Sequence, residues 1–600
     1  MIMNDKPKSI WSRPWKGLAR VLAWFGLLAG AVFLTVYCLG LLSDKNTPAS
    51  VFALISVGVA ALGVALVSLI RWLCFWRNFR RFLFGLACLA TVIAVFYAEE
   101  NVRGKYAWKQ FKSGWEAKGE RFDLASNVPA PVPDDQNFAM TPLWVETVCA
   151  TMGAERGRTW YGDKVAALGH TNFVQRLHLP TELEGRKGRK LEAPADGGNW
   201  QKAEKADLKA RQVYYRQAAA ITNFFPVAAQ AQTPAEDVLL ALSRYDTTIE
   251  EIRRASRLPY SRFPIGYADA NPAGILLPHL SALKRSVMTV QLRTLAELQA
   301  GQAEKALDDI GLMLRLTAAI RTEPFLVSHL VRISMLDLVL QPVWEGLGDL
   351  RWSDAQLAAL GTELGKLDFL ADYPLAKRGE RACNVGMLDC AHGNWNREFL
   401  SWMDADWRFT PPRFPMWAVQ VGPGGWIEQN KVAYCRMSFD LLTPLVNPET
   451  RIVSPDAEAR ARNVCQEIRV TPCNWSVGLL LPALIPCSSR FAHAQTAADL
   501  ARVACALERY RLAQGNFPES LAALAPKVME RIPPDVISGQ PLKYRRTDDG
   551  RFVLYSVGWN QTDDGGKPGW PDKEAAPGGF WREFAQKTAG GDWVWQYPAK

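Results

Sequence analysis

The longest uninterrupted runs of apolar residues lie near the N-terminus. Val21–Leu42 and Ala49–Ile70 are each 22 residues long without a charge, and Phe82–Ala98 has 17 such residues. At a rise of about 1.5 Å per residue, the two longer runs can cross a hydrocarbon core about 30 Å thick. The third run is at the short end of this range, so a buried core helix is its alternative. Beside two spans we expect a third, which gives three N-terminal transmembrane helices.

Basic residues flank these runs unevenly. Nine of them lie in the tail before the first run and in the loop after the second: Lys6, Lys8, Arg13, Lys16, Arg20, Arg71, Arg77, Arg80 and Arg81. The loop between the first two runs carries only Lys45, beside Asp44. Because cytoplasmic segments are enriched in lysine and arginine, we expect the N-terminus in the cytoplasm. Residues from about Glu99 onward are then expected in the periplasm, outside the inner (cytoplasmic) membrane.

The net charge of +10 does not indicate a nucleic-acid partner once it is located along the chain. Residues 1–81 hold ten lysines and arginines and two aspartates, a balance of +8, so residues 82–600 carry only +2. Nucleic-acid-binding domains present a concentrated basic surface, and the basic loop Gly185–Lys190 is interpreted as solvated. The expected partners are the lipid bilayer and proteins of the cell envelope.

A juxtamembrane helix and a linker are expected over residues 99–136, after a transmembrane anchor of residues 1–98. Trp108, Phe111 and Trp115 recur at helical spacing. They predict that the third helix continues, lying on the bilayer or on the body of the protein. The alternating prolines of 128–135 favour a stiff spacer and a domain boundary.

Helical periodicity dominates the expected domain 137–370. Thr233 and Glu236 have capping-box spacing. One apolar face then contains Val238, Leu242, Tyr245, Ile249 and Ile252. Further helices are predicted over 279–300, 302–321, 324–346 and, after the cap pattern of Ser353 and Gln356, 354–366. The segment Leu295–Asp309 resembles a single tetratricopeptide helix pair. Since three units at a fixed period are absent, an irregular helical bundle is predicted.

Residues 371–490 are rich in tryptophan, proline and cysteine and are expected to be irregular. Eight cysteines follow the predicted spans: Cys149, Cys383, Cys390, Cys435, Cys465, Cys473, Cys487 and Cys505. In an oxidising compartment some of them could form disulfides, and no pairing follows from the sequence. Cys383, Cys390 and His392 lack the CxxC spacing of a zinc site, so a disulfide or buried thiols are favoured there.

The sequence contains no motif for catalysis. HExxH, GxSxG, P-loop and dinucleotide-binding glycine patterns are all absent. His329 lies in an apolar run and is interpreted as a core histidine. The acidic pairs Glu250, Glu251, Asp308 and Asp309 are interpreted as exposed helix faces. No catalytic residue and no organic cofactor are therefore assigned.

The C-terminal residues 491–600 predict a small α+β module. A helix is expected over about 492–513 and a short one near 520–524, followed by strands over 542–546 and 552–557. Asp548–Gly550 between the strands is a hairpin signal, because glycine tolerates positive φ. An acidic, glycine-rich loop follows over 558–566.

This order of elements resembles the periplasmic part of G-type pseudopilins of type II secretion. The matching residues are Leu507, Tyr510, Gly515–Pro518, Pro541–Tyr544 and Leu554–Gly558. The chain departs from that family in its three spans and in lacking a Phe-Thr-Leu-Ile-Glu-type leader, so it is not expected to be a fibre subunit. As a whole it looks like uncharacterised bacterial multi-pass membrane proteins.

The resemblance also implies a calcium ion in the loop after the last strand. It carries over to Asn560, Asp563 and Asp564, with Asp572 as a further candidate ligand. Calcium prefers six to eight oxygen ligands, which such a loop can supply. The alternative is a solvated turn in which Asp and Gly serve the backbone.

The expected fold is a membrane-anchored, mainly α protein with three N-terminal spans, an exported helical bundle and a pseudopilin-like α+β module. The expected function is that of an extracytoplasmic interaction or scaffold protein, linked by fold analogy to a secretion or pilus-like assembly. The alternative is a membrane-anchored hydrolase with its site between the helical domain and residues 371–490.

Overall fold

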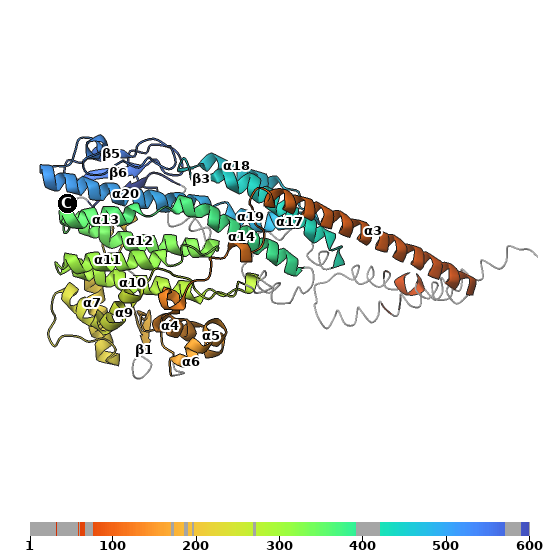
Figure 1. Ribbon diagram of the computed structural model, residues 1–600, viewed down its shortest axis with the longest axis horizontal. Helices are drawn as coiled ribbons and strands as arrows, with labels where there is room; N and C mark the ends of the chain where they lie inside the picture. The colour runs from red at the N-terminus through yellow and green to blue at the C-terminus, as the bar shows by residue number, and fades with distance from the viewer. Residues whose placement is uncertain are drawn as a thin grey trace, which may run out of the picture. The chain divides into compact units, whose positions relative to one another are not determined.

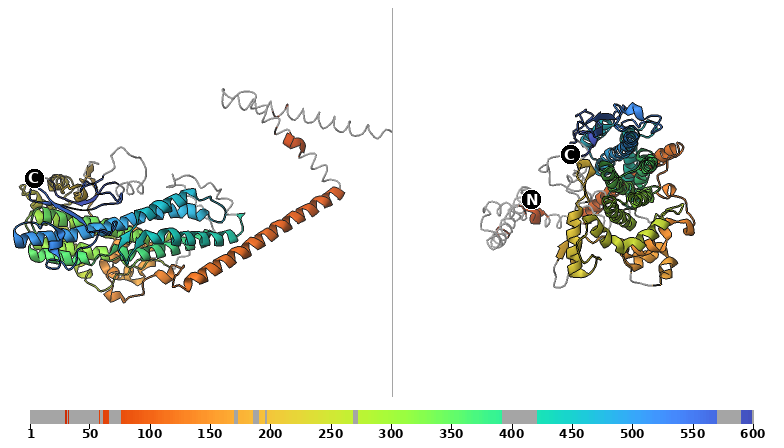
Figure 2. Two further views of the ribbon diagram at one scale, coloured as in Figure 1. Left: turned by 90° about the horizontal axis from the view of Figure 1, so that it is seen from above. Right: turned by 90° about the vertical axis from the view of Figure 1, so that its left-hand side faces the viewer.

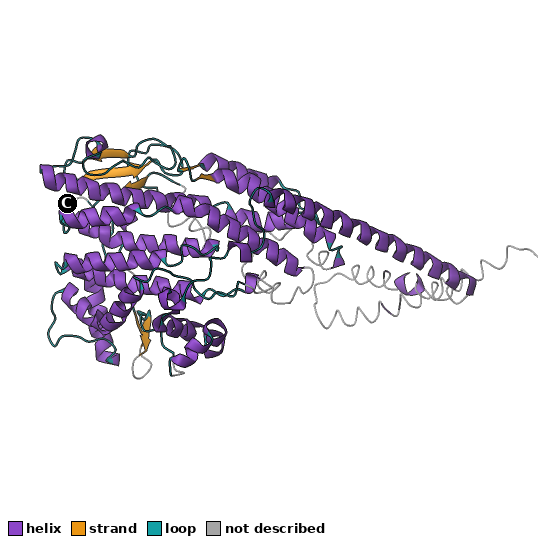
Figure 3. Ribbon diagram, viewed as in Figure 1, coloured by secondary structure: helices purple, strands orange, loops and turns teal. Residues whose placement is uncertain are grey.

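The computed structural model describes most of the chain after the second apolar run. The described residues are 30, 32, 58, 61–65, 76–169, 173–184, 190–194, 197–267, 272–391, 421–569 and 590–598. They belong to two compact units, Met1–Glu99 and Glu100–Lys600. Helices predominate in the described part, and strands are few and short (Figure 3).

The third apolar run lies in one continuous helix, α3 (Trp76–Glu116), of 41 residues. Its large apolar side chains are exposed: Phe82, Leu83, Phe84, Leu86, Leu89, Val92, Ile93, Val95 and Phe96. A helix that is apolar all round and unburied is suited to lipid rather than to water. The first two predicted spans lie outside the described residues, apart from a few helical positions.

Three helical segments of the described part are long and apolar enough to cross a membrane: Phe79–Glu116, Leu326–Gly348 and Trp475–Gln514. They differ in their surroundings. The apolar stretch of the first is unburied, whereas the other two are largely buried in the larger unit, where they carry Arg332 and Asp499 in its interior. The first segment is therefore the one whose surface suits a bilayer.

The larger unit is built around long helices that lie side by side (Figure 1). They are α10 (Pro278–Gln299), α11 (Ala303–Ala318), α12 (Leu326–Gly348), α13 (Asp354–Gly365), α14 (Phe369–Ala391) and α20 (Cys487–Gln514). The predicted helices of the bundle agree with α10 to α13 within a few residues. Gly301 forms the turn between α10 and α11 with φ +77°, a conformation that favours glycine.

Shorter elements precede this bundle. They are α4 (Pro142–Met152), α5 (Ala154–Tyr161), α6 (Asp163–Ala167), β1 (Glu182–Glu184), β2 (Lys190–Glu192), α7 (Leu208–Thr222), α8 (Pro234–Leu242) and α9 (Asp246–Ala255). The capping boxes predicted at Thr233 and Ser353 are both formed, and the predicted apolar face of α8 and α9 is buried. Most of the basic loop between β1 and β2 lies outside the described residues.

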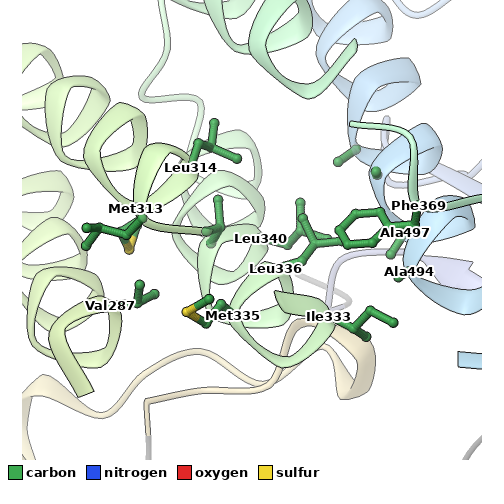
Figure 4. Packing of buried hydrophobic residues seen from close by; sticks show 14 of the residues in the cluster. Val287, Met313, Leu314, Ile333, Met335, Leu336, Leu340, Phe369, Ala494 and Ala497 are labelled. Carbon is green, nitrogen blue, oxygen red and sulfur yellow. The ribbon is translucent and has the colours of Figure 1, made fainter. Parts of the chain in front are cut away.

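One hydrophobic core joins segments that are far apart in the sequence. Met335, Leu336 and Leu340 of α12 lie between residues of α10 and α11 on one side and Phe369, Ala494 and Ala497 on the other (Figure 4). The same cluster contains Phe122, Tyr434 and Trp595. The expected segments 137–370, 371–490 and 491–600 therefore share a core, and the boundaries between them stay predictions.

The expected irregular region 371–490 is instead mostly helical in its described residues. Besides α14 it contains α17 (Gly425–Met437), α18 (Pro455–Glu467) and α19 (Trp475–Leu484), with the short strand pair β3 (Val446–Asn447) and β4 (Ile452–Val453). Pro374 and Pro482 lie inside α14 and α19. Prolines usually end helices, which is why the sequence pattern concealed these two.

Seven of the eight cysteines that follow the spans are free thiols: Cys149, Cys383, Cys435, Cys465, Cys473, Cys487 and Cys505. Of all eight, five are buried and three are partly buried. Burial raises the pKa of the Cys383 and Cys435 thiols, so these thiols stay protonated. The buried-thiol alternative is therefore the correct one for Cys383, and the disulfides considered from the sequence are not formed. His392 lies outside the described residues.

The C-terminal module contains a three-stranded antiparallel sheet beside α20 (Figures 1 and 2). Its strands are β5 (Lys543–Arg546), β6 (Phe552–Ser556) and β7 (Trp593–Trp595). The predicted hairpin is confirmed, with Gly550 at φ +74°. The sequence did not predict β7, which is three residues long, and α20 begins at Cys487 rather than near residue 492.

Candidate functional site

The acidic loop after β6 holds its predicted ligands in hydrogen bonds to protein groups. Asn560 Nδ2 donates to Asp564 Oδ2 at 2.8 Å, and the Tyr555 hydroxyl donates to Asp563 Oδ1 at 2.9 Å. Lys543 Nζ lies 3.2 Å from Asp563 Oδ2. The Gly565 N–H and the Tyr555 hydroxyl lower the pKa of Asp563, so this carboxylate is charged. A cation here must compete with the Lys543 ammonium.

Asp592 closes this loop, and the sequence reasoning missed it. It is 2% exposed and accepts the backbone N–H groups of Asp564 and Gly566 at 3.3 and 2.7 Å. Burial raises its pKa although these donors oppose the shift. The one sequence signal for Asp592 was its position directly before Trp593–Trp595, a segment with the composition of a strand. Asp572 lies outside the described residues.

No group of three or more His, Cys, Asp or Glu side chains is placed to hold a metal ion within the described ranges. The loop carboxylates and Asp592 are nevertheless gathered at one end of the three strands. The calcium site therefore stays a prediction, and so does the solvated turn that is its alternative.

A crevice between α12, α14, α17 and α20 gathers titratable groups. Lys377 and Glu380 of α14 lie there beside Tyr373, Tyr434 and Cys487. Burial raises the pKa of Glu380 to about 7, and burial together with the charge of Arg381 lowers that of Lys377 to about 8. The enclosed space is only ≈10 Å³, which is room for about one water molecule. No sequence motif pointed to this crevice.

A buried polar cluster lies between α10, α12 and α14. His279 Nε2 is 2.8 Å from Glu323 Oε1, and Ser328 donates to the other oxygen of Glu323. The carboxylate thus separates the serine from the histidine, whereas a catalytic triad needs a serine–histidine contact. His329 is fully buried with Nε2 3.0 Å from the Glu323 carbonyl, which confirms it as a core histidine.

Asp309, which was expected on an exposed face, is fully buried. It accepts from Arg293 Nε at 2.7 Å and from Arg253 Nη2. Two arginines from α9 and α10 neutralise it, which is how a charge is tolerated in a core. Asp308 is exposed as expected. Burial and the charge of Asp309 together raise the pKa of the neighbouring Glu297 to about 8.

The part of α3 that belongs to the larger unit is seated on α17. Gly425 N, in the first turn of α17, donates to Asn101 Oδ1 at 2.8 Å. Glu100 is buried, with Arg103 Nη2 at 2.6 Å and Gln429 Nε2 at 3.1 Å from its carboxylate. Directly after the apolar run ends, the polar side chains of Glu100 and Asn101 therefore have hydrogen-bond partners within the protein.

The aromatic stripe of α3, which is Trp108, Phe111 and Trp115, also packs against the rest of the larger unit. Trp115 stacks on Phe439 with ring centroids 3.7 Å apart, and Trp108 meets Phe122 edge-on at 5.4 Å. The Arg381 guanidinium lies 4.1 Å from the centroid of Phe439 and pairs with Glu120. Of the two expected positions for the stripe, the body of the protein is the one observed.

These features define a mainly helical protein with an apolar helix whose surface suits a membrane. Comparison with models of known families, with curated proteins and with solved structures finds no match to this chain. The pseudopilin resemblance of residues 491–600 stays a prediction.

Proposed function

We propose that this protein is a membrane-anchored scaffold whose larger unit contacts other proteins of the cell envelope on the extracytoplasmic side. The observation that supports it best is α3. One uninterrupted helix carries an exposed apolar run and, from Glu100 onward, the seat on α17. The helix that carries the apolar run thus continues without a break into the residues that contact the rest of the larger unit.

The extracytoplasmic side is supported by the placement of basic residues around the apolar runs. A role in a secretion or pilus-like assembly is supported only by the sequence resemblance of residues 491–600 to pseudopilins. The observed helix and β5–β6 hairpin have the order that this resemblance requires. A calcium ion at Asn560, Asp563 and Asp564 belongs to the same proposal.

Cross-linking in intact cells tests the scaffold role. The full chain is cross-linked, extracted in mild detergent and purified, and the attached proteins are identified. We expect a reproducible set of envelope proteins that is not captured by an unrelated multi-pass protein of equal abundance. An identical set for both proteins, or cytoplasmic proteins alone, contradicts the proposal.

A membrane-anchored hydrolase is the second candidate, and the α14 crevice favours it. The pKa values of Lys377 and Glu380 lie near neutrality, where groups that transfer protons are most effective. We expect any hydrolysis of ester, amide, phosphate or glycoside substrates to be lost in both Lys377→Met and Glu380→Gln and retained in Lys366→Met. Activity that survives both changes, or no turnover of any of the four classes, contradicts this candidate.

A further inference from the structure

The segment of α3 just beyond the apolar run has two different faces. Gly104, Trp108 and Phe111 lie on the face that is seated on the body. At about 100° per residue, the opposite face is formed by other side chains of the same turns. These are Val102, Lys105, Tyr106 and Lys109.

The side chains on this free face are exposed, and its two lysines have no acidic partner in the described part of the chain. Val102 and Tyr106 are 70% and 67% exposed. Lys105 and Lys109 are exposed and have no ion pair in the part of the chain that the structure describes. Arg103 nearby is paired with Glu100, and the exposed Glu99 leaves the face with a net positive charge.

The position of this face matches the headgroup layer. Lys105 and Lys109 follow Ala98 by about 10 and 16 Å along the helix axis. Because Cα–Cβ bonds tilt toward the helix N-terminus, both lysine side chains lean back toward the apolar run. The 17-residue run spans only about 25 Å of a core about 30 Å thick. Such a short run is matched by thinning of the bilayer and by flanking side chains that reach back to the interface, as the two lysines can.

We propose that Val102, Lys105, Tyr106 and Lys109 form a binding face for the phosphate groups of anionic phospholipids. The lysines supply the complementary charge. Tyr106 and Val102 are an interfacial aromatic and an apolar contact of the kind found at headgroup depth. This inference rests on the proposed anchoring of α3 in a membrane.

Residue-resolved labelling of amines tests the face in the full chain. The protein is inserted into nanodiscs of phosphatidylcholine alone or of phosphatidylcholine with phosphatidylglycerol. Lysines are acetylated with an uncharged succinimidyl ester and quantified by mass spectrometry. Lys209 and Lys527 are the controls, because both are exposed lysines without an ion pair in the described part.

Phosphatidylglycerol should slow the labelling of Lys105 and Lys109 about two- to fivefold, as expected for an attraction of about 1 kcal/mol per lysine. It should leave Lys209 and Lys527 unchanged. Salt at about 1 M, where the Debye length is about 3 Å, should remove the effect. Equal rates in both lipids overturn this inference alone. If the two lysines are labelled at equal rates in both discs but more slowly in native membranes, the face binds a protein partner. That result also overturns the lipid-binding proposal. Failure to insert into either disc removes the membrane anchor as well.

Discussion

Gly104 of α3 and Gly425 of α17 approach so closely that neither has room for a β-carbon. A Cβ on Gly104 would lie 2.2 Å from the Gly425 carbonyl oxygen, and one on Gly425 would lie 1.9 Å from the Glu100 carbonyl oxygen. Glycine at both positions lets the two backbones touch, and Asn101 then reaches the first turn of α17. The seat of α3 depends on this contact.

Gly104→Leu should therefore loosen the seat. Overpacking costs about 1–3 kcal/mol, and we expect a lower thermal midpoint and faster proteolysis between residues 98 and 130. Gly114→Ala on the same helix is the control, because nothing lies within 4 Å of its added Cβ. Alanine at that helix position should stabilise by about 0.5–1 kcal/mol. Equal effects of the two substitutions contradict the close contact.

Asp309→Ala should be among the most destabilising single changes in the bundle. It removes the buried carboxylate that Arg253 and Arg293 share and leaves them mainly exposed carboxylates as partners, and breaking a buried pair costs about 3–5 kcal/mol. The neighbouring Asp308→Ala removes an exposed carboxylate and should cost less than about 0.5 kcal/mol. Thermal unfolding in mild detergent measures both variants. A small effect at Asp309 means that the arginines find other partners.

Glu297 should make stability depend on pH. Burial raises its folded pKa to about 8 from an ordinary value of 4.5. Between these values the unfolded chain binds fewer protons than the folded one, so this group's contribution to stability falls as pH rises. Glu297→Gln should raise the free energy of unfolding by about 1–3 kcal/mol at pH 9 and change it little at pH 4. A difference that does not grow with pH contradicts the burial of this carboxyl group.

Calcium binding is testable in the full chain by isothermal titration. If Asn560, Asp563 and Asp564 hold the ion, heat should appear on adding calcium and disappear in Asp564→Ala. Asp549→Ala, in the β5–β6 hairpin, should keep it. No calcium-dependent heat at millimolar metal leaves the solvated turn as the correct interpretation.

Local signals in the sequence predicted local structure well. The Thr233 and Ser353 caps, the four bundle helices and the Asp548–Gly550 hairpin depend on residues a few positions apart. The burial of Asp309 could not be predicted in this way, because arginines 16 and 56 positions away decide it.

Separation along the sequence also explains why the α3–α17 contact, Asp592 and the α14 crevice were not predicted. Asn101 and Gly425 are 324 positions apart. Asp592 reaches the acidic loop across 26 residues, and β7 is too short for periodicity to show. Lys377 and Glu380 acquire their shifted pKa values from helices far along the chain, and no motif marks such an environment.

A topology reporter tests the central claim most directly. Two reporters are each fused after Lys600. Alkaline phosphatase is active only outside the cytoplasm. Green fluorescent protein, if it is exported unfolded, fluoresces only when it stays in the cytoplasm. Three spans that begin in the cytoplasm predict an active phosphatase and a dark fluorescent fusion. A fluorescent fusion with an inactive phosphatase contradicts the extracytoplasmic placement of the larger unit.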